Sequence, residues 1–226
     1  MIFKNKKAFI IERFTNHKTN TKSYEDLNGD FIFEATFKLK ETKLKNKEYC
    51  VLSREGYNMG IFIQDFNGEN FIKWVWWETD ENNEQIYNDL FVHRNLDLTI
   101  LNTIKVIKKD DVFTMYINDE LYDTRTIKNK IYDYSDKYVF VGAGNPFCKN
   151  NNECWFSGEI TDVKVYNTSN EIVEDLFLWY DFKKISNFKV FDKSGNGNHG
   201  VIFEPIKLKN KKNKEFNKLG RPAKIV

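Results

Sequence analysis

The chain has 226 residues, of which 41% are apolar and 16% aromatic. That is enough for one large domain with a sizeable core, and the 11 glycines and 3 prolines are too few for a fibrous or disordered chain. The net charge is +2, but the segment 207–226 has a charge of +7, which leaves −5 for the rest. Because phosphate binding needs a cationic face, the body of the chain argues against a nucleic-acid partner. We interpret 1–206 as a single domain and 207–226 as a basic tail or linker.

Short segments with alternating apolar and polar residues recur along the chain. In 31–38 every second residue is Phe or Ala, so the apolar side chains share one face. The pairs 110–111 and 118–119 are Asp-Asp and Asn-Asp, which indicate tight turns between strands. Many short strands without intervening helical segments predict an all-β fold, a two-sheet antiparallel sandwich or jelly roll. The predicted strands are 31–38, 50–53, 58–64, 71–77, 103–109, 112–118, 121–124, 138–142, 155–167, 176–182 and 200–203.

The sequence predicts neither a membrane-spanning helix nor a secretory signal. The uncharged stretches are much shorter than the ~18 residues that a membrane-spanning helix needs. No apolar run of the length that a secretory signal needs follows the charged residues at 4–7, so no such signal is expected there.

Three cysteines, Cys50, Cys148 and Cys154, do not make a complete disulfide framework. Cys148 and Cys154 flank a polar loop and could close a short bridge, although two reduced thiols are the favoured interpretation. No C-x-x-C pair or histidine cluster accompanies them, so a zinc site is not expected.

The most aromatic predicted strand, 71–77, contains Trp74, Trp76 and Trp77. Alternation puts Trp74 and Trp76 on one face and Trp77 on the other. Aromatic rings stack on the apolar faces of sugars, so these three residues are the candidate carbohydrate platform. The alternative is that one set packs in the core while the other covers a sheet face. For Trp74 and Trp76, core packing is at least as well supported as ligand binding.

Glu159 and Asp162 are the candidate catalytic carboxylates. Sandwich glycosidases place two acids on one face of a strand, at positions i and i+2. A spacing of three puts Glu159 and Asp162 on opposite faces of a regular strand unless a bulge intervenes, and Lys164 stands where a further acid would be. His199 has no recognisable nucleophile and acidic partner, so a catalytic base is not expected there. These patterns argue against a hydrolase.

The segment 192–200, D-K-S-G-N-G-N-H-G, is the candidate metal site. Asp192 offers a carboxylate, Asn196 and Asn198 offer amide oxygens, and glycines such as Gly200 let carbonyl groups turn inward. Hard oxygen ligands on a tight loop suit Ca²⁺. The alternative is a Gly/Asn turn whose side chains bond only the local backbone. The residue types alone do not separate these two interpretations.

Four segments together resemble laminin-G-like jelly rolls of the concanavalin A-like superfamily. They are F-S-G-E-I-T-D-V-K-V-Y-N at 156–167, M-Y-I-N-D-E-L at 115–121, Y-V-F-V-G-A-G at 138–144 and the loop at 192–200. The last motif is fairly specific, whereas each of the others is weak by itself.

The resemblance implies a jelly roll with a structural calcium ion at the loop 192–200, where Asp162 would also contribute a ligand. In the family that loop usually stands near the domain start, so its place here implies a circular permutation. The alternative is a second, truncated domain that begins at about Leu176.

The resemblance also implies function. It favours a non-catalytic module that binds a carbohydrate or glycoconjugate. One alternative is a protein-interaction or assembly module of a larger surface, virion or sugar-processing protein, with another protein or domain as its partner. Another is a sandwich glycosidase or lyase. Fold alone does not decide between these.

Overall fold

A computed structural model of the protein describes residues 2–3, 8–11, 29–41, 48–54, 59–66, 69–92, 96–132, 139–143, 154–167, 175–182, 185–186 and 189–203. Cys148 and the basic segment 207–226 lie outside these residues. In the described part every regular element is a β-strand, and no helix there is long and apolar enough to cross a membrane. The all-β prediction is confirmed.

The strands form two antiparallel sheets. The seven-stranded sheet contains β1 (Ile2–Phe3), β3 (Phe31–Leu39), β8 (Asn102–Lys109), β9 (Val112–Ile117), β10 (Glu120–Thr126), β13 (Gly158–Asn167) and β14 (Asp175–Tyr180). The ten-stranded sheet contains β2 (Ala8–Ile11), β4 (Glu48–Arg54), β5 (Met59–Phe66), β6 (Glu69–Thr79), β7 (Gln85–Phe91), β11 (Lys130–Ile131), β12 (Val139–Val141), β15 (Ile185–Ser186), β16 (Lys189–Val190) and β17 (Gly200–Phe203).

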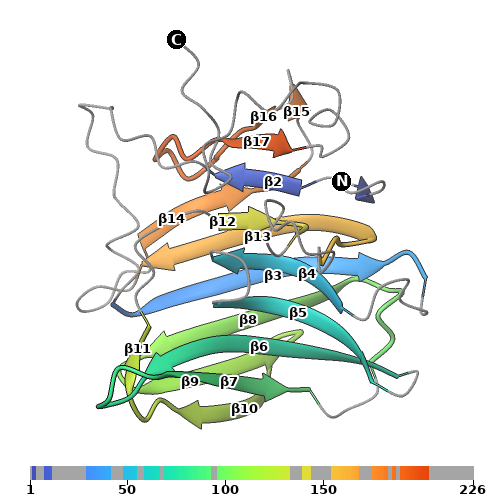
Figure 1. The fold of residues 1–226 in the computed structure, drawn as a ribbon. Helices are drawn as coiled ribbons and strands as arrows, with labels where there is room; N and C mark the ends of the chain where they lie inside the picture. Colours follow the sequence, from blue (N-terminus) through green and yellow to red (C-terminus); the bar gives the residue numbers. More distant parts are fainter. Residues whose placement is uncertain are drawn as a thin grey trace, which may run out of the picture.

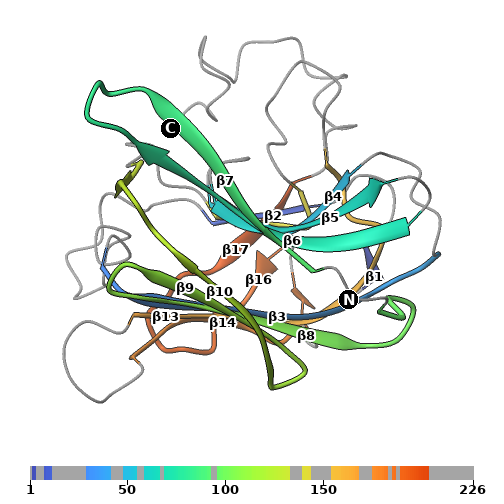
Figure 2. The same ribbon diagram turned by 90° about the horizontal axis from the view of Figure 1, so that it is seen from below.

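The two sheets lie face to face as the layers of a sandwich (Figures 1 and 2). The seven-stranded sheet has the order β1-β13-β3-β8-β9-β10, and β14 also pairs with β13. The ten-stranded sheet has the order β11-β6-β5-β4-β12-β2-β17-β16-β15, and β7 also pairs with β6. The predicted two-sheet sandwich is therefore the fold of the chain.

Local sequence explains the central strands and their turns. In β3 the even positions from Glu34 to Lys38 are half-buried while the odd positions are buried, so the alternation seen in the sequence is that of a half-buried strand. The turn between β9 and β10 has positive φ at both Asn118 and Asp119, as a two-residue hairpin with the right twist requires.

Segments near the C-terminus complete both sheets. β14 pairs with β13, which in turn pairs with β3, and β17 pairs with β2 and β16. The strands β14, β16 and β17 therefore belong to the same two sheets as the earlier strands of the chain.

The core between the sheets is strongly aromatic. Phe31 and Phe33 from β3 face Trp74 from β6, and Phe113 from β9 packs against Trp74 and Trp76 with ring centroids 5.6 and 4.8 Å apart. All of these side chains are at most 1% exposed. Burial of this apolar surface is the main force that holds the two layers together.

Candidate functional site

The outer face of the ten-stranded sheet, turned away from the core, carries a cluster that we call the aromatic–polar face. Cross-strand pairing brings its members together: Glu48 lies opposite Gln64, Lys73 opposite Phe91, and Trp77 opposite Tyr87. Because side chains alternate along each strand, residues two apart in β6 and β7 share this face. The face is made of Glu48, Gln64, Lys73, Trp77, Tyr87 and Asp89.

Lys73 is the centre of the aromatic–polar face. Its Nζ lies 2.5 Å from Glu48 Oε1 and donates to Gln64 Oε1 at 3.0 Å and to the Tyr87 hydroxyl at 3.4 Å. The side chains of Lys73 and Glu48 are only 7% and 13% exposed. Burial of the Lys73–Glu48 ion pair costs desolvation energy, so the pair contributes little to the free energy of folding. Its role here is to fix the positions of the side chains around it. Lys73 thus holds the Tyr87 hydroxyl in place.

Trp77 and Tyr87 form the solvent-facing part of this face. Their ring centroids are 5.4 Å apart and the ring planes meet at 77°. Tyr87 is 41% exposed and Trp77 is half-buried. The pKa of Tyr87 is well above its usual value, mainly because the phenol is partly buried. The neighbouring Asp89 carboxylate raises this pKa further through its charge and through a hydrogen bond with the hydroxyl. The hydroxyl therefore remains a neutral hydrogen-bonding group at physiological pH.

Trp74 and Trp76 do not belong to this face. They are 0% and 1% exposed inside the sandwich, and Trp76 Nε1 donates to Glu78 Oε1 at 2.9 Å. An indole whose faces are covered by core side chains cannot stack on a sugar. Of the predicted platform only Trp77 remains, and this corrects the sequence interpretation for the other two. Sequence reasoning missed Tyr87, although its place opposite Trp77 depends only on the β6–β7 pairing.

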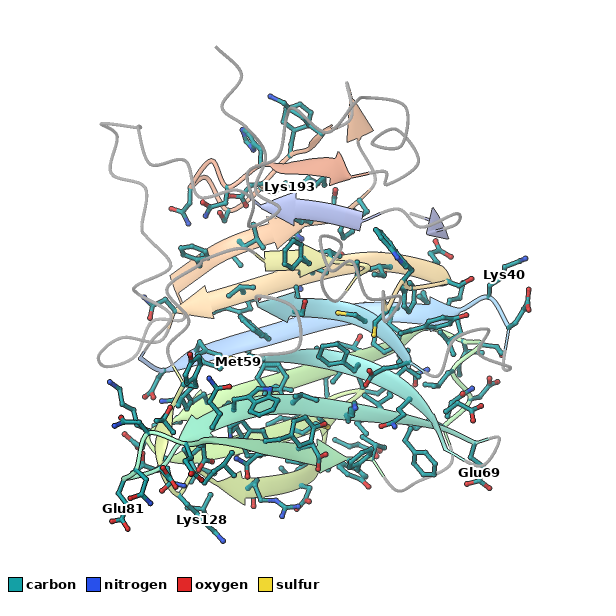
Figure 3. The ribbon with its side chains drawn as sticks, in the orientation of Figure 1. Lys40, Met59, Glu69, Glu81, Lys128 and Lys193 are labelled. Carbon is teal, nitrogen blue, oxygen red and sulfur yellow. The ribbon has the colours of Figure 1, made fainter. Side chains whose placement is uncertain are left out.

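The loop around Asp192 lies far from the aromatic–polar face. Figure 3 shows Lys193 near β17 and β2, and Glu81, in the turn between β6 and β7, at the opposite end of the sandwich. Asp192 itself is 8% exposed.

Both carboxylate oxygens of Asp192 accept hydrogen bonds. Oδ1 accepts from the backbone N–H groups of Trp179 and Ser194, at 3.0 and 2.9 Å. Oδ2 accepts from the Ser194 hydroxyl at 2.8 Å and from the Asn198 N–H at 2.9 Å. The carboxylate thus has four donors around it, which is the environment of a turn-forming Asp.

The other predicted calcium ligands on this loop take part in hydrogen bonds or close packing. The side-chain amides of Asn196 and Asn198 donate to the Phe177 carbonyl at 3.1 and 2.9 Å, and the Asn198 carbonyl accepts from the Tyr180 hydroxyl. A Cβ at Gly200 would lie 2.7 Å from Val190 Cγ1, so close packing accounts for this glycine.

The structure does not bring Asp162 and Asp192 together as ligands. Trp179 stands between them: its Nε1 donates to Asp162 Oδ1 at 2.8 Å, while its backbone N–H donates to Asp192. Among the described residues no group of three or more His, Cys, Asp or Glu side chains could hold a metal ion. In the structure these residues form a hydrogen-bonded turn, and calcium binding at this loop stays a prediction.

Glu159 and Asp162 are on the same face of β13, contrary to the sequence expectation. Pairing with β3 shifts register between Ile160 and Asp162, so Thr161 is an extra, bulged residue. Glu159 lies opposite Lys38 and Asp162 opposite Thr36, two residues apart on β3. Because of the bulge, the two acids share a face although they are three residues apart. The sequence argument that their spacing excludes a catalytic pair is therefore wrong.

Both carboxylates have other partners. Glu159 forms an ion pair with Lys38 at 3.1 Å, and Asp162 accepts the Trp179 indole N–H with Lys164 Nζ 4.0 Å away. Burial acts to lower the pKa of Lys164, but the hydrogen bond and charge of Glu34 outweigh it and raise that pKa. Asp162 therefore lies beside a permanent cation.

His199 has a packing role in the Asp192 loop. Its Nδ1 accepts a hydrogen bond from the Asp192 backbone N–H at 3.1 Å. The imidazole ring packs edge-to-face against Phe191, with the two ring centroids 5.3 Å apart. The imidazole nitrogen that a general base would use is thus engaged with the backbone.

Solved structures share this architecture, whereas no protein-family model and no curated protein matches the sequence. A candidate carbohydrate-binding protein from Bacteroides ovatus matches with a TM-score of 0.64 and 16% identity, over 89% of this chain and 56% of that one. The chain thus spans little more than half of that protein.

Two further matches have lower scores. The CBM40 of a Ruminococcus gnavus sialidase, bound to α2,3-sialyllactose, has a TM-score of 0.49 and 14% identity, over 65% of this chain and 82% of that one. Domains LG4–5 of the mouse laminin α1 chain have a TM-score of 0.47 and 9% identity, over 72% of this chain and 40% of that one. The two-sheet architecture and the Bacteroides ovatus match together show that the chain folds as a two-sheet antiparallel β-sandwich.

Proposed function

We propose that this protein is a non-catalytic carbohydrate-binding module that holds a sugar against Trp77 and Tyr87. The observation that carries the proposal is the aromatic–polar face, where two solvent-facing rings stand beside the buried Lys73–Glu48 ion pair. Binding sites for small ligands combine aromatic walls with a few well-placed polar groups. The fold likeness to a candidate carbohydrate-binding protein supports the same function.

The geometry of the rings suggests how a sugar would be held. Because the two planes meet at 77°, one ring can lie flat against the apolar face of a sugar while the other forms a wall. The Tyr87 hydroxyl, held by Lys73, and the half-buried Asp89 carboxylate can then bond sugar hydroxyl groups. Polar groups fixed before binding lose little entropy when the ligand arrives.

Trp77→Ala is expected to weaken sugar binding about 30-fold, which corresponds to about 2 kcal/mol for a buried aromatic anchor. Tyr87→Phe keeps the ring and removes the hydroxyl, so it should cost less than Tyr87→Ala. The purified chain is first screened on a glycan array, and affinity for the best glycan is then measured by titration calorimetry. The melting temperature of each variant shows whether the fold is intact.

Phe191→Ala is the matched control, because Phe191 is an exposed aromatic residue, 45% exposed, in the distant Asp192 loop. It should bind as tightly as the unchanged protein. If the chain binds no glycan on the array, the proposed function is wrong. If it binds a glycan that neither Trp77→Ala nor Tyr87→Ala weakens, the site is elsewhere.

The module is expected not to hydrolyse glycans, even though Glu159 and Asp162 share a face. Glu159 is engaged in an ion pair with Lys38, and Asp162 accepts the Trp179 indole N–H, so each carboxylate already has a protein partner where a catalytic acid would meet the sugar. Purified protein should release no reducing sugar from a polysaccharide panel. Turnover that is lost in both Glu159→Gln and Asp162→Asn would show the opposite.

A further inference from the structure

Cys50 and Cys154 are neighbours across the edge of β4. The backbone N–H of Cys50 donates to the carbonyl of Cys154 at 3.0 Å, so the two main chains lie side by side at this point. Main chains joined by such a hydrogen bond lie about 4.7–4.9 Å apart, which is compatible with the roughly 4.4–6.8 Å between Cα atoms that a disulfide spans. They also share one buried cluster with Phe62 and Val75 on the outer side of the sheet.

Both cysteines are thiols in the structure, and neither sulfur is open to solvent. The residues are 0% and 4% exposed, and Cys154 Sγ donates to Glu48 Oε2 at 3.5 Å. Burial and then the charges of Cys154 and Glu48 raise the pKa of Cys50 well above its usual value, although Ser53 acts against this. The reactive thiolate is therefore scarce in the folded protein, and oxidation is expected during folding.

We propose that Cys50 and Cys154 form a disulfide when the chain folds in an oxidising environment. The oxidant is a small-molecule disulfide such as oxidised glutathione. One protein thiolate attacks it to give a mixed disulfide and release one glutathione thiol. The second protein thiolate then displaces the other glutathione, so the two cysteines are oxidised and one glutathione disulfide is reduced to two thiols. The sequence interpretation considered only a bridge between Cys148 and Cys154.

The bond would stabilise the sandwich. It would tie β4 to the residues that lead into β13, and it would close a loop of about 100 residues. In the chain-entropy model such a loop constrains the unfolded state strongly, and the melting temperature should rise by about 10 °C. Cys154 would lose its hydrogen, but Glu48 would keep Lys73 as its partner.

The experiment refolds the full chain with a mixture of oxidised and reduced glutathione and compares Cys148→Ala with Cys50→Ala. Cys148→Ala should lose two titratable thiols, give a peptide that joins Cys50 and Cys154 on non-reducing digestion, and melt about 10 °C higher until a reductant is added. Cys50→Ala should show no such shift. Native protein in the same mixture should oxidise much more slowly than refolding protein.

Two results would overturn the proposal. One is a refolded Cys148→Ala protein that keeps both thiols. The other is an unchanged chain whose only linked peptide joins Cys148 to Cys154. Binding of a glycan is not part of this test, so its outcome is independent of the proposed function.

Discussion

Asp192→Ala is expected to lower the free energy of unfolding by about 3 kcal/mol, equally in calcium and in chelator. The substitution leaves four donors without their acceptor: the N–H groups of Trp179, Ser194 and Asn198, and the Ser194 hydroxyl. A hydrogen bond to a charged group contributes about 1.5–3 kcal/mol, and water replaces part of the loss at this partly open loop. The melting temperature should fall by roughly 6–12 °C.

Two variants sharpen this measurement. Asp192→Asn keeps one acceptor oxygen and should lose about half as much stability. Asp123→Ala is the matched control, because Asp123 is exposed on β10 and its carboxylate accepts from the adjacent Thr124 N–H. A calcium site predicts a different pattern: calcium raises the melting temperature, and Asp192→Ala removes that rise without harm in chelator. That pattern would refute the hydrogen-bonded turn.

Trp74→Ala is expected to destabilise the protein by about 3–5 kcal/mol, the usual cost of removing a large aromatic side chain from a core. Trp74 is 0% exposed, and its ring centroid lies 5.6 Å from those of both Phe33 and Phe113. Deletion therefore leaves a cavity between the two sheets. Urea unfolding should show a lower midpoint with little change in its slope.

Trp77→Ala is the matched control for this prediction, because the neighbouring indole is half-buried on the outer face. It should cost much less stability, about 1 kcal/mol, while it removes most of the sugar affinity. If Trp74→Ala does not fold, Trp74→Phe keeps most of the volume and should show a smaller loss of the same kind. A Trp74→Ala protein that is stable but binds sugar poorly would restore Trp74 to the platform.

Sequence patterns predicted the strands best where one face of a strand is apolar and the other is polar. This is so for 31–38, for the hairpin at 118–119 and for the aromatic segment 71–77, all of which the structure contains as strands or turns. β7 was missed because its inward position Asn88, opposite Trp76, is polar while its outward positions Tyr87 and Phe91 are aromatic, so its alternation is weak. Its register with β6 nevertheless places Tyr87 beside Trp77.

The sequence by itself determined the all-β class, the hairpins and the split of Trp74 from Trp77, because strand period and turn chemistry are local properties. Only the tertiary structure decided what depends on pairing between distant segments. The bulge at Thr161 turns Glu159 and Asp162 to the same face, and it arises from the register between β13 and β3. Likewise, the donors around Asp192 include the backbone of β14. These donors reach the Asp192 carboxylate only after the final strands have paired within the sandwich. A local sequence pattern cannot specify which distant groups will form hydrogen bonds with a buried carboxylate.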